Sequence, residues 1–251
     1  MLSSMKSPWF YRLKPRPHAQ MRLFVFPHAG GSSLSYSKWR DLAPENVELI
    51  VVELPGHGAR HREKLLMNFK SLIEDLKAAF ESEGDTPSVF FGHSMGSLIA
   101  FELYRALHSP FREKIRGLAL SSFRPPSQKN LREREKIAHL PETELIEKLS
   151  QFAPVAPEIL RDSAARTYFL KILRADIALM EAYETEDIKP LSVPLLVFGG
   201  ADDSSVKPEE LKQWADFGTI LHDVQIFPGG HFYHFEHAKS VFLSLTQNFF
   251  V

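Results

Sequence analysis

Residues 88–107 read SVFFGHSMGSLIAFELYRAL, and this stretch decides the fold. A short apolar run over 88–91 predicts a buried strand, and the longer apolar segment over 95–107 predicts a helix. Between them stands Gly-x-Ser-x-Gly, the pattern of a sharp strand-to-helix turn that exposes a serine Oγ at the top of a sheet. Glycines on both sides relieve crowding at such a turn. We therefore predict that Ser94 is a nucleophile; the alternative is a helix-capping serine in a Gly-rich turn.

Strand-like and helix-like segments alternate on both sides of this turn, which is the signature of a parallel sheet with crossover helices. Further strands are predicted at 21–27, 47–54, 115–121, 193–198 and 224–227, and helices at 69–80 and 235–250. The strand segments are continuous apolar runs, as expected of strands covered on both faces. The predicted fold class is α/β, with a mostly parallel central sheet flanked by helices.

The length of the chain fits one domain of this class. Residues 1–20 are interrupted by prolines and are predicted to form an extended leader, and residues 21–251 a single domain. From about 124 to 190 there is no strand signal, but helix-favouring stretches stand at 143–149 and 168–183. This predicts a helical lid inserted into the domain. The alternative is a set of ordinary crossover helices.

Composition excludes several classes of function. Lys and Arg total 30 against 31 for Asp and Glu, which argues against a nucleic-acid-binding protein. Cysteine is absent, which excludes disulfides, thiolate metal sites and a cysteine nucleophile. The N-terminus lacks the apolar region of a secretory signal, and no stretch approaches the roughly 20 apolar residues that cross a bilayer. We therefore expect a cytoplasmic protein without a membrane span.

A serine hydroxyl needs a base, and chain order selects one among eleven histidines. With an elbow of this kind, the acid and then the base follow the serine, on loops after later strands. His231 lies in Pro-Gly-Gly-His, after the last predicted strand and before the closing helix. We predict His231 as the general base. His234 and His237 are expected to face solvent from that helix.

The acid is expected after the strand at 193–198, where the chain continues as Gly-Gly-Ala-Asp-Asp over 199–203. The acid orients the imidazole through one hydrogen bond to Nδ1–H. Both Asp202 and Asp203 can serve, and spacing alone does not separate them.

Two backbone amides are predicted to form an oxyanion hole. One is the N–H of Met95, at the start of the helix, and the other is the N–H of Ala29 in the loop Pro-His-Ala-Gly-Gly over 27–31. The competing interpretation of the glycines is a phosphate-binding loop. They fit neither Gly-x-Gly-x-x-Gly nor the Walker pattern, which disfavours a nucleotide.

Three motifs stand in a recognisable order: FPHAGG at 26–31, GHSMG at 92–96 and PGGHF at 228–232. From about Leu23 to Phe232 the chain resembles the stand-alone (type II) thioesterases of polyketide and nonribosomal peptide synthesis. The resemblance implies an α/β-hydrolase fold with a helical lid. It also implies that the acid is the second aspartate, Asp203, and that the enzyme needs no cofactor or metal.

By the same resemblance, the reaction is hydrolysis of acyl thioesters from the phosphopantetheine arm of acyl or peptidyl carrier proteins, which edits stalled or misprimed synthases. The partners are then carrier proteins, which are acidic, and Arg132, Arg134 and Lys136 are candidates for a basic patch; a solvated helix face is the alternative. Three other functions stay open: a medium-chain fatty-acyl thioesterase, an esterase or lipase acting on small free esters, and a binding protein with a vestigial triad.

Two loops depart from the family pattern. In VELPGHGAR (52–60), His57 and Ala59 stand where the family usually has an arginine and a nearby acidic residue. After the strand at 115–121 the chain reads SSFRPP (121–126) rather than the frequent Gly-Arg pair. Both loops are expected to border the substrate pocket.

Overall fold

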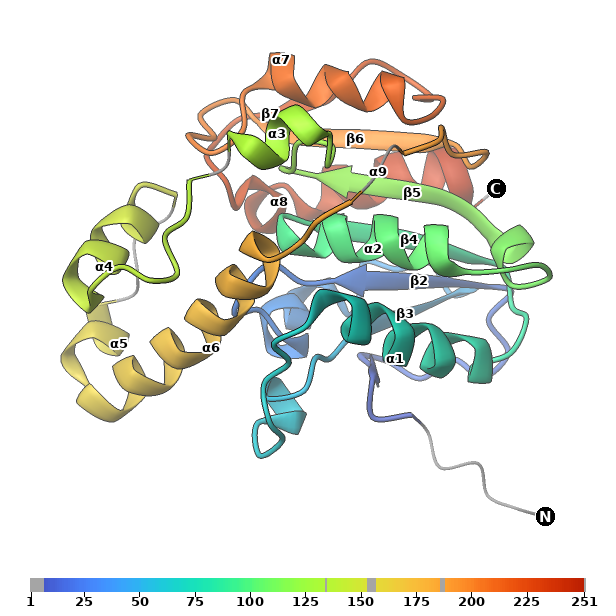
Figure 1. The fold of residues 1–251 in the computed structure, drawn as a ribbon. Helices are drawn as coiled ribbons and strands as arrows, with labels where there is room; N and C mark the ends of the chain where they lie inside the picture. The colour runs from blue at the N-terminus through green and yellow to red at the C-terminus, as the bar shows by residue number, and fades with distance from the viewer. Residues whose placement is uncertain (1–6, 134, 153–156, 186–187, 251) are drawn as a thin grey trace.

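A central sheet organises the chain, with the strand order β1-β3-β2-β4-β5-β6-β7 (Figure 1). The computed structural model describes residues 7–133, 135–152, 157–185 and 188–250. The strands are β1 (Phe10–Arg12), β2 (Met21–Phe26), β3 (Val47–Val52), β4 (Ser88–His93), β5 (Ile115–Ser121), β6 (Leu195–Gly200) and β7 (Gln225–Phe227). Strands β2 to β7 pair in parallel. The predicted mostly parallel sheet is confirmed, and the bounds of its six predicted strands hold to within two residues.

The edge strand β1 was not anticipated. It lies inside the segment expected to be an extended leader and pairs antiparallel with β3, with Phe10 opposite Val52. Phe10 is buried and packs edge-on against Phe24 of β2 with ring centroids 5.2 Å apart. A strand of three residues close to prolines carries too little periodicity to be recognised in the sequence.

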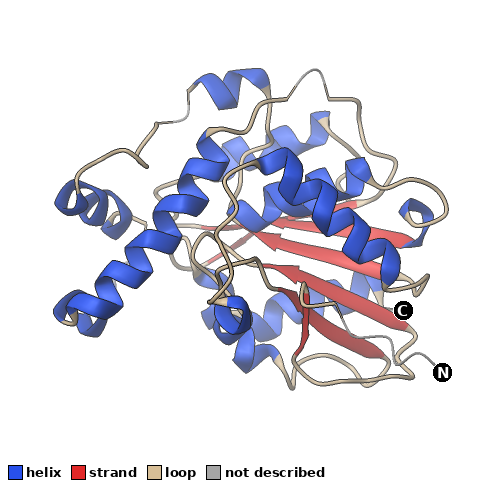
Figure 2. Cartoon of the chain, turned by 60° about the horizontal axis from the view of Figure 1, so that its bottom comes forward, coloured by secondary structure: helices blue, strands red, loops and turns tan. Residues whose placement is uncertain are grey.

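Helices cover both faces of the sheet, as the edge-on view of the strands shows (Figure 2). Successive strand residues point to opposite faces, so Phe90 joins the core beneath α1 (Phe69–Ser82) and α2 (Met95–Ala106). Phe91 joins the core on the other face, beneath η1 (Ser33–Trp39) and α9 (Ala238–Phe249). Because both faces are buried, the strands are apolar over most of their length.

The predicted helix at 69–80 corresponds to α1, and its sequence explains why this segment forms a helix. Its apolar residues recur at helical spacing and are all buried: Phe69, Leu72, Ile73, Leu76 and Phe80. The side chain of Asn68 caps the helix by accepting a hydrogen bond from the Ser71 amide at 2.9 Å.

The described part of the segment between β5 and β6 contains helices joined by loops and no strand. It contains α3 (Gln128–Arg132), α4 (Glu142–Ser150), α5 (Pro157–Arg161) and α6 (Ser163–Glu181), of which α4 to α6 extend to one side of the sheet (Figure 1). Helices α4 and α6 share a small core of their own, built around Leu145, Leu170 and Leu173. One side of helix α6 therefore packs on α4, and its other side faces the sheet.

The C-terminal region differs from its prediction in one respect. Instead of one helix over 235–250, the chain forms the short α8 (Tyr233–Glu236) and then α9, with His237 at the junction of the two. In α8, Tyr233 and His234 are buried, and the Tyr233 hydroxyl lies 2.6 Å from Ser121 Oγ of β5. Helix α7 (Pro208–Leu211) lies earlier in the chain, between β6 and β7. Short 3-10 turns η2 (Gly58–Arg60), η3 (Arg112–Lys114) and η4 (Lys212–Asp216) complete the described elements.

The topology brings the predicted site residues to one edge. The ends of parallel strands lie at the same edge, so the loops after β2, β4, β6 and β7 meet there. The chain order reverses between β2 and β4, and ligands of open α/β sheets bind at such a switch point. None of the described helices combines the length and the apolar composition required to cross a membrane.

Candidate active site

Ser94 occupies a strained turn between β4 and α2. Its backbone has φ 55° and ψ −122°, a conformation that non-glycine residues rarely adopt and that is commonly stored at functional sites. A Cβ at Gly92 would lie 2.4 Å from the Gly96 carbonyl oxygen, and a Cβ at Gly96 would lie 1.9 Å from the Phe26 carbonyl oxygen. Only glycine fits either position, as the sequence pattern predicts.

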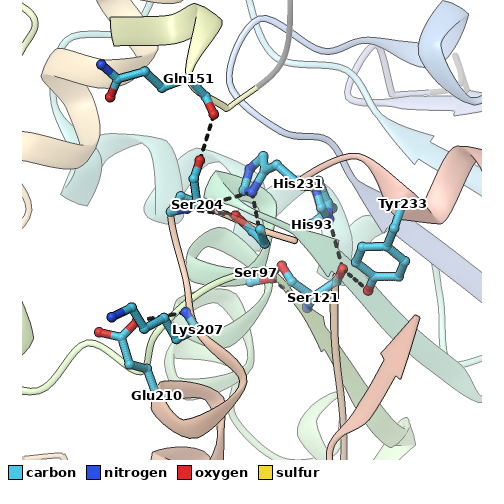
Figure 3. Close-up of polar contacts among 11 residues, drawn as sticks. His93, Ser97, Ser121, Gln151, Ser204, Lys207, Glu210, His231 and Tyr233 are labelled. Atoms are coloured by element: carbon cyan, nitrogen blue, oxygen red, sulfur yellow. Dashed lines mark hydrogen bonds and ion pairs between the residues drawn. The ribbon is translucent and has the colours of Figure 1, made fainter. Parts of the chain in front are cut away.

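Hydrogen bonds to β5 hold this turn in place. The Ser94 amide donates to the Ser121 carbonyl at 2.8 Å. The Ser97 hydroxyl lies 2.8 Å from the Gly92 carbonyl and 3.0 Å from the Ser121 carbonyl. At the same place His93 Nδ1 lies 2.8 Å from Ser121 Oγ, which in turn lies 2.6 Å from the Tyr233 hydroxyl (Figure 3). These contacts offset the backbone strain at the serine.

His231 and Asp203 lie together on the loops after β7 and β6. The Nδ1 atom of His231 is 2.9 Å from Asp203 Oδ2. Asp203 Oδ1 accepts hydrogen bonds from the Ser205 amide at 2.9 Å and from the Ser205 hydroxyl at 2.6 Å. Ser205 Oγ is also 2.9 Å from His231 Nδ1. Since Nδ1 is engaged by the acid, Nε2 is the nitrogen left to exchange a proton with a nucleophile.

The structure separates the two aspartates that spacing left equivalent. Asp203 is buried, whereas Asp202 is exposed. Burial alone would raise the pKa of the Asp203 carboxyl, but the hydrogen bonds and charge of His231 and the hydrogen bonds of Ser205 outweigh it and lower the pKa. Asp203 is therefore the carboxylate placed to orient His231 and to stabilise its protonated form.

Ser94 and His231 line the same cavity, whose volume is about 410 Å³. Apolar side chains of α6 form one wall of this cavity, namely Phe169, Leu173, Ile177 and Met180. The Ser204 hydroxyl donates to the Gln151 carbonyl at 2.6 Å and so ties the acid loop to the end of α4 (Figure 3). The cavity thus lies between the sheet edge and the helical insertion.

The two predicted oxyanion donors flank the serine. Met95 opens α2, and the first amides of a helix have no acceptor within it. Ala29 lies in the loop after β2, and both Ala29 and Ser94 line the cavity. The partial positive charge at the N-terminus of α2 also attracts the negative charge that develops on the oxyanion. The arrangement suits acyl transfer through a tetrahedral intermediate.

The expectation that His234 faces solvent is wrong. Its side chain is fully buried, and its ring lies 3.8 Å from that of His93, which is also fully buried. The break between α8 and α9 turns His234 inward under the elbow, which a helical projection of the sequence could not reveal. His237, at that break, is half-buried.

These two buried imidazoles are neutral. Burial lowers the pKa of His93 and of His234 well below the ordinary value, and the neighbouring histidines His231 and His28 lower it further. The floor beneath the serine is therefore uncharged.

Acid should therefore destabilise the fold. Below pH about 6.5 the unfolded chain binds protons at these two positions and at His28, whose pKa burial lowers to about 3, whereas the folded chain does not. The free energy of unfolding therefore falls by roughly 4 kcal/mol per pH unit as the pH decreases, until the lowered pKa values are reached. Urea unfolding at a series of pH values measures this slope.

A matched pair of variants tests whether the buried histidines cause this slope. His234→Phe removes one of the three buried sites and should lower the slope by about a third. His108 is exposed, and His108→Asn should leave the slope as in the parent protein. An equal slope in all three proteins would contradict the assignment.

The two loops that depart from the family pattern have different positions. Ser122, Phe123 and Arg124 line the cavity, as expected of the SSFRPP loop. His57 does not line it; the ring is buried, and Nε2 lies 2.9 Å from Asp176 Oδ2 of α6. Neither Asp176 nor Ser205 was predicted from the sequence. The partner of Asp176 lies far away in the chain, and the sequence does not show which side chains Ser205 contacts.

No group of three or more histidine, aspartate or glutamate side chains within the described ranges is arranged to hold a metal ion.

Comparisons with known proteins agree with this geometry. Residues 21–248 match the family model described as the thioesterase domain. Gramicidin S biosynthesis protein GrsT of Aneurinibacillus migulanus is 28% identical over 233 residues, which cover 93% of this chain and 90% of that protein. The medium-chain S-acyl fatty acid synthase thioesterase of Homo sapiens is 28% identical over 246 residues, which cover 96% and 90%.

A solved structure is similar over nearly its whole length. The type II thioesterase BorB from the borrelidin biosynthetic cluster superposes with a TM-score of 0.82 at 29% identity. The superposition covers 96% of this chain and 97% of that one. The two chains thus share one fold over nearly their whole length.

Proposed function

The chain belongs to the thioesterase domain family, and from this premise we propose that it removes acyl groups from the phosphopantetheine arms of acyl or peptidyl carrier proteins. It is a thioester hydrolase of the α/β-hydrolase fold. The observation that carries the proposal is the meeting of Ser94 and a His231–Asp203 pair at a largely apolar cavity. The role is editing, in which stalled or misprimed groups are released from a synthase.

The proposed mechanism uses the serine as a covalent nucleophile. Ser94 Oγ attacks the thioester carbonyl while His231 Nε2 takes the hydroxyl proton. The amides of Met95 and Ala29 stabilise the tetrahedral oxyanion, and removal of one such donor typically costs about 3 kcal/mol. The intermediate then expels the thiolate, which takes the proton from His231. Water, activated by His231, hydrolyses the acyl-enzyme and releases the carboxylic acid.

The apolar wall of α6 supports an acyl substrate. Burial of an apolar chain against Phe169, Leu173 and Ile177 contributes about 0.8 kcal/mol per buried methylene. We propose that residues 124–190 act as a lid over the acyl chain of the substrate. The proposed location is the cytoplasm, where carrier-protein synthases work.

Carrier docking is proposed for the exposed side of the insertion. Arg132 and Lys136 are exposed and suit an acidic partner, while Arg134 lies outside the described residues. The similarity to the human enzyme favours a second candidate, a medium-chain fatty-acyl thioesterase with the same chemistry.

Substrate competition tests the proposal. We expect turnover of an acyl-carrier protein to exceed that of the matching acyl-CoA, because only the carrier adds protein contacts at the mouth of the cavity. The measurement is kcat/KM for the two thioesters and for a nitrophenyl ester with the same acyl group. A strong preference for the free oxygen ester would overturn the carrier-protein assignment, and a preference for fatty-acid synthase carriers would favour the second candidate.

A further inference from the structure

A buried pair outside the triad contacts the loop that bears Ala29. Asp176, on α6, and His57, after β3, are each 3% exposed. One carboxylate oxygen, Asp176 Oδ2, lies 2.9 Å from His57 Nε2 and accepts a hydrogen bond from the Gly30 amide at 2.7 Å. A single side chain of the helical insertion thus joins two loops at the edge of the sheet.

Both nitrogens of His57 face acceptors. Nδ1 lies 3.1 Å from the Pro55 carbonyl oxygen, which can only accept, and Nε2 faces the carboxylate of Asp176. A neutral imidazole carries one N–H and can satisfy only one of the two. The geometry therefore requires a doubly protonated His57.

The charges around His57 favour the same state. Asp176 faces it from α6 and Glu53 from the end of β3, whereas His28, in the loop after β2, is neutral because burial and nearby histidines lower its pKa to about 3. Arg60 of η2 is directed to the Glu53 carbonyl and to the Glu63 carboxylate. Burial alone would lower the pKa of His57, but the hydrogen bond and charge of Asp176 outweigh it and raise the pKa.

The contact of Asp176 with Gly30 bears on the oxyanion hole. Gly30 has φ +76°, and Gly31 closes the turn by donating to the His28 carbonyl at 2.9 Å. The Gly30 N–H belongs to the peptide unit after the Ala29 Cα, and the Ala29 N–H belongs to the peptide unit before it. The bond to Asp176 fixes the first of these two units and so limits the backbone conformations open to Ala29. Glycine itself offers little resistance to backbone rotation.

We propose that His57 and Asp176 are positioning residues, a buried imidazolium–carboxylate pair that holds the loop at Ala29 and Gly30 in the conformation that directs the Ala29 N–H into the oxyanion hole. Neither residue lines the cavity, so both act through the loop. The inference rests on the proposed role of Ala29 and adds a pH dependence to it. Loss of the His57 proton at alkaline pH removes one hydrogen bond and the charge that fixes Asp176, and the loop is released.

The activity of the wild-type enzyme should therefore fall at alkaline pH as well as at acidic pH. His57→Gln, uncharged at every pH, should lower kcat by between about ten- and a hundredfold with little change in KM, because misplacement of an amide affects the transition state. The alkaline fall should be absent from this variant. His57→Arg keeps a permanent charge and should retain most of the activity without an alkaline fall.

The decisive measurements are pH profiles of kcat and KM on an acyl thioester, together with ¹⁵N NMR of histidine-labelled wild-type protein. His57→Arg identifies the His57 resonances, and we expect both nitrogens to be protonated at neutral pH. An alkaline fall that persists unchanged in both variants, or a neutral His57 in the spectrum, overturns the inference. Failure of the proposed function is distinct, since an enzyme inactive on thioesters would still show the charged His57.

Discussion

Replacement of Ser94 by alanine should lower kcat for thioester hydrolysis by about a millionfold, as expected when the nucleophile of a cooperative triad is removed. The fold should survive, because the turn is held by the Ser94 amide and by Ser97, which alanine leaves in place. The strained φ of 55° is also no harder for alanine than for serine to adopt.

Labelling with a fluorophosphonate probe, with and without the substitution, measures the same residue by a second route. Wild type should be labelled once and Ser94→Ala not at all. Ser240, exposed on α9, provides the matched control, and Ser240→Ala should label and hydrolyse as wild type does. Retention of labelling in Ser94→Ala would mean that another serine is the nucleophile, and a wild type that is never labelled would favour a vestigial triad.

The elements around Ser94 were predictable because their signals are local. A buried strand needs only a run of apolar residues, and the elbow needs glycines two positions before and after the serine. The structure explains the second requirement, since side chains at Gly92 and Gly96 would collide with backbone oxygens. Chain order then selected His231 as the candidate base, because loops after parallel strands must meet at one edge.

Other features depend on contacts between distant segments and left no local trace. His57 and Asp176 are 119 positions apart, and nothing in either segment indicates the other. The burial of His234 depends on a break between two short helices, where the sequence offered one continuous apolar pattern. Strand β1 depends on the free edge of β3, which exists only after the sheet has formed.

The choice between the two aspartates shows the same limit. The end of β6 at Gly200 predicts that the acid follows shortly after it in the sequence. Which of the two adjacent aspartate side chains turns inward depends on the conformation of the loop. In the structure the Asp202 amide donates to the Gly229 carbonyl at 2.9 Å, and this backbone contact aligns the loops after β6 and β7. Its side chain then points to solvent, while that of Asp203 reaches His231.

Asp203→Asn should consequently lower kcat by about ten-thousandfold, whereas Asp202→Asn should stay within a few-fold of wild type. In the first variant the side-chain amide of asparagine no longer holds the proton on His231 Nδ1. The imidazole can then carry its proton on Nε2 and present that proton, rather than a lone pair, to the serine. In the second, the exposed side chain changes while the backbone contact to Gly229 is kept. The measurement is kcat for both variants, with thermal unfolding to verify that each is folded. A larger loss in Asp202→Asn than in Asp203→Asn would require the loop after β6 to be rearranged in the active enzyme, and the assigned acid would be wrong.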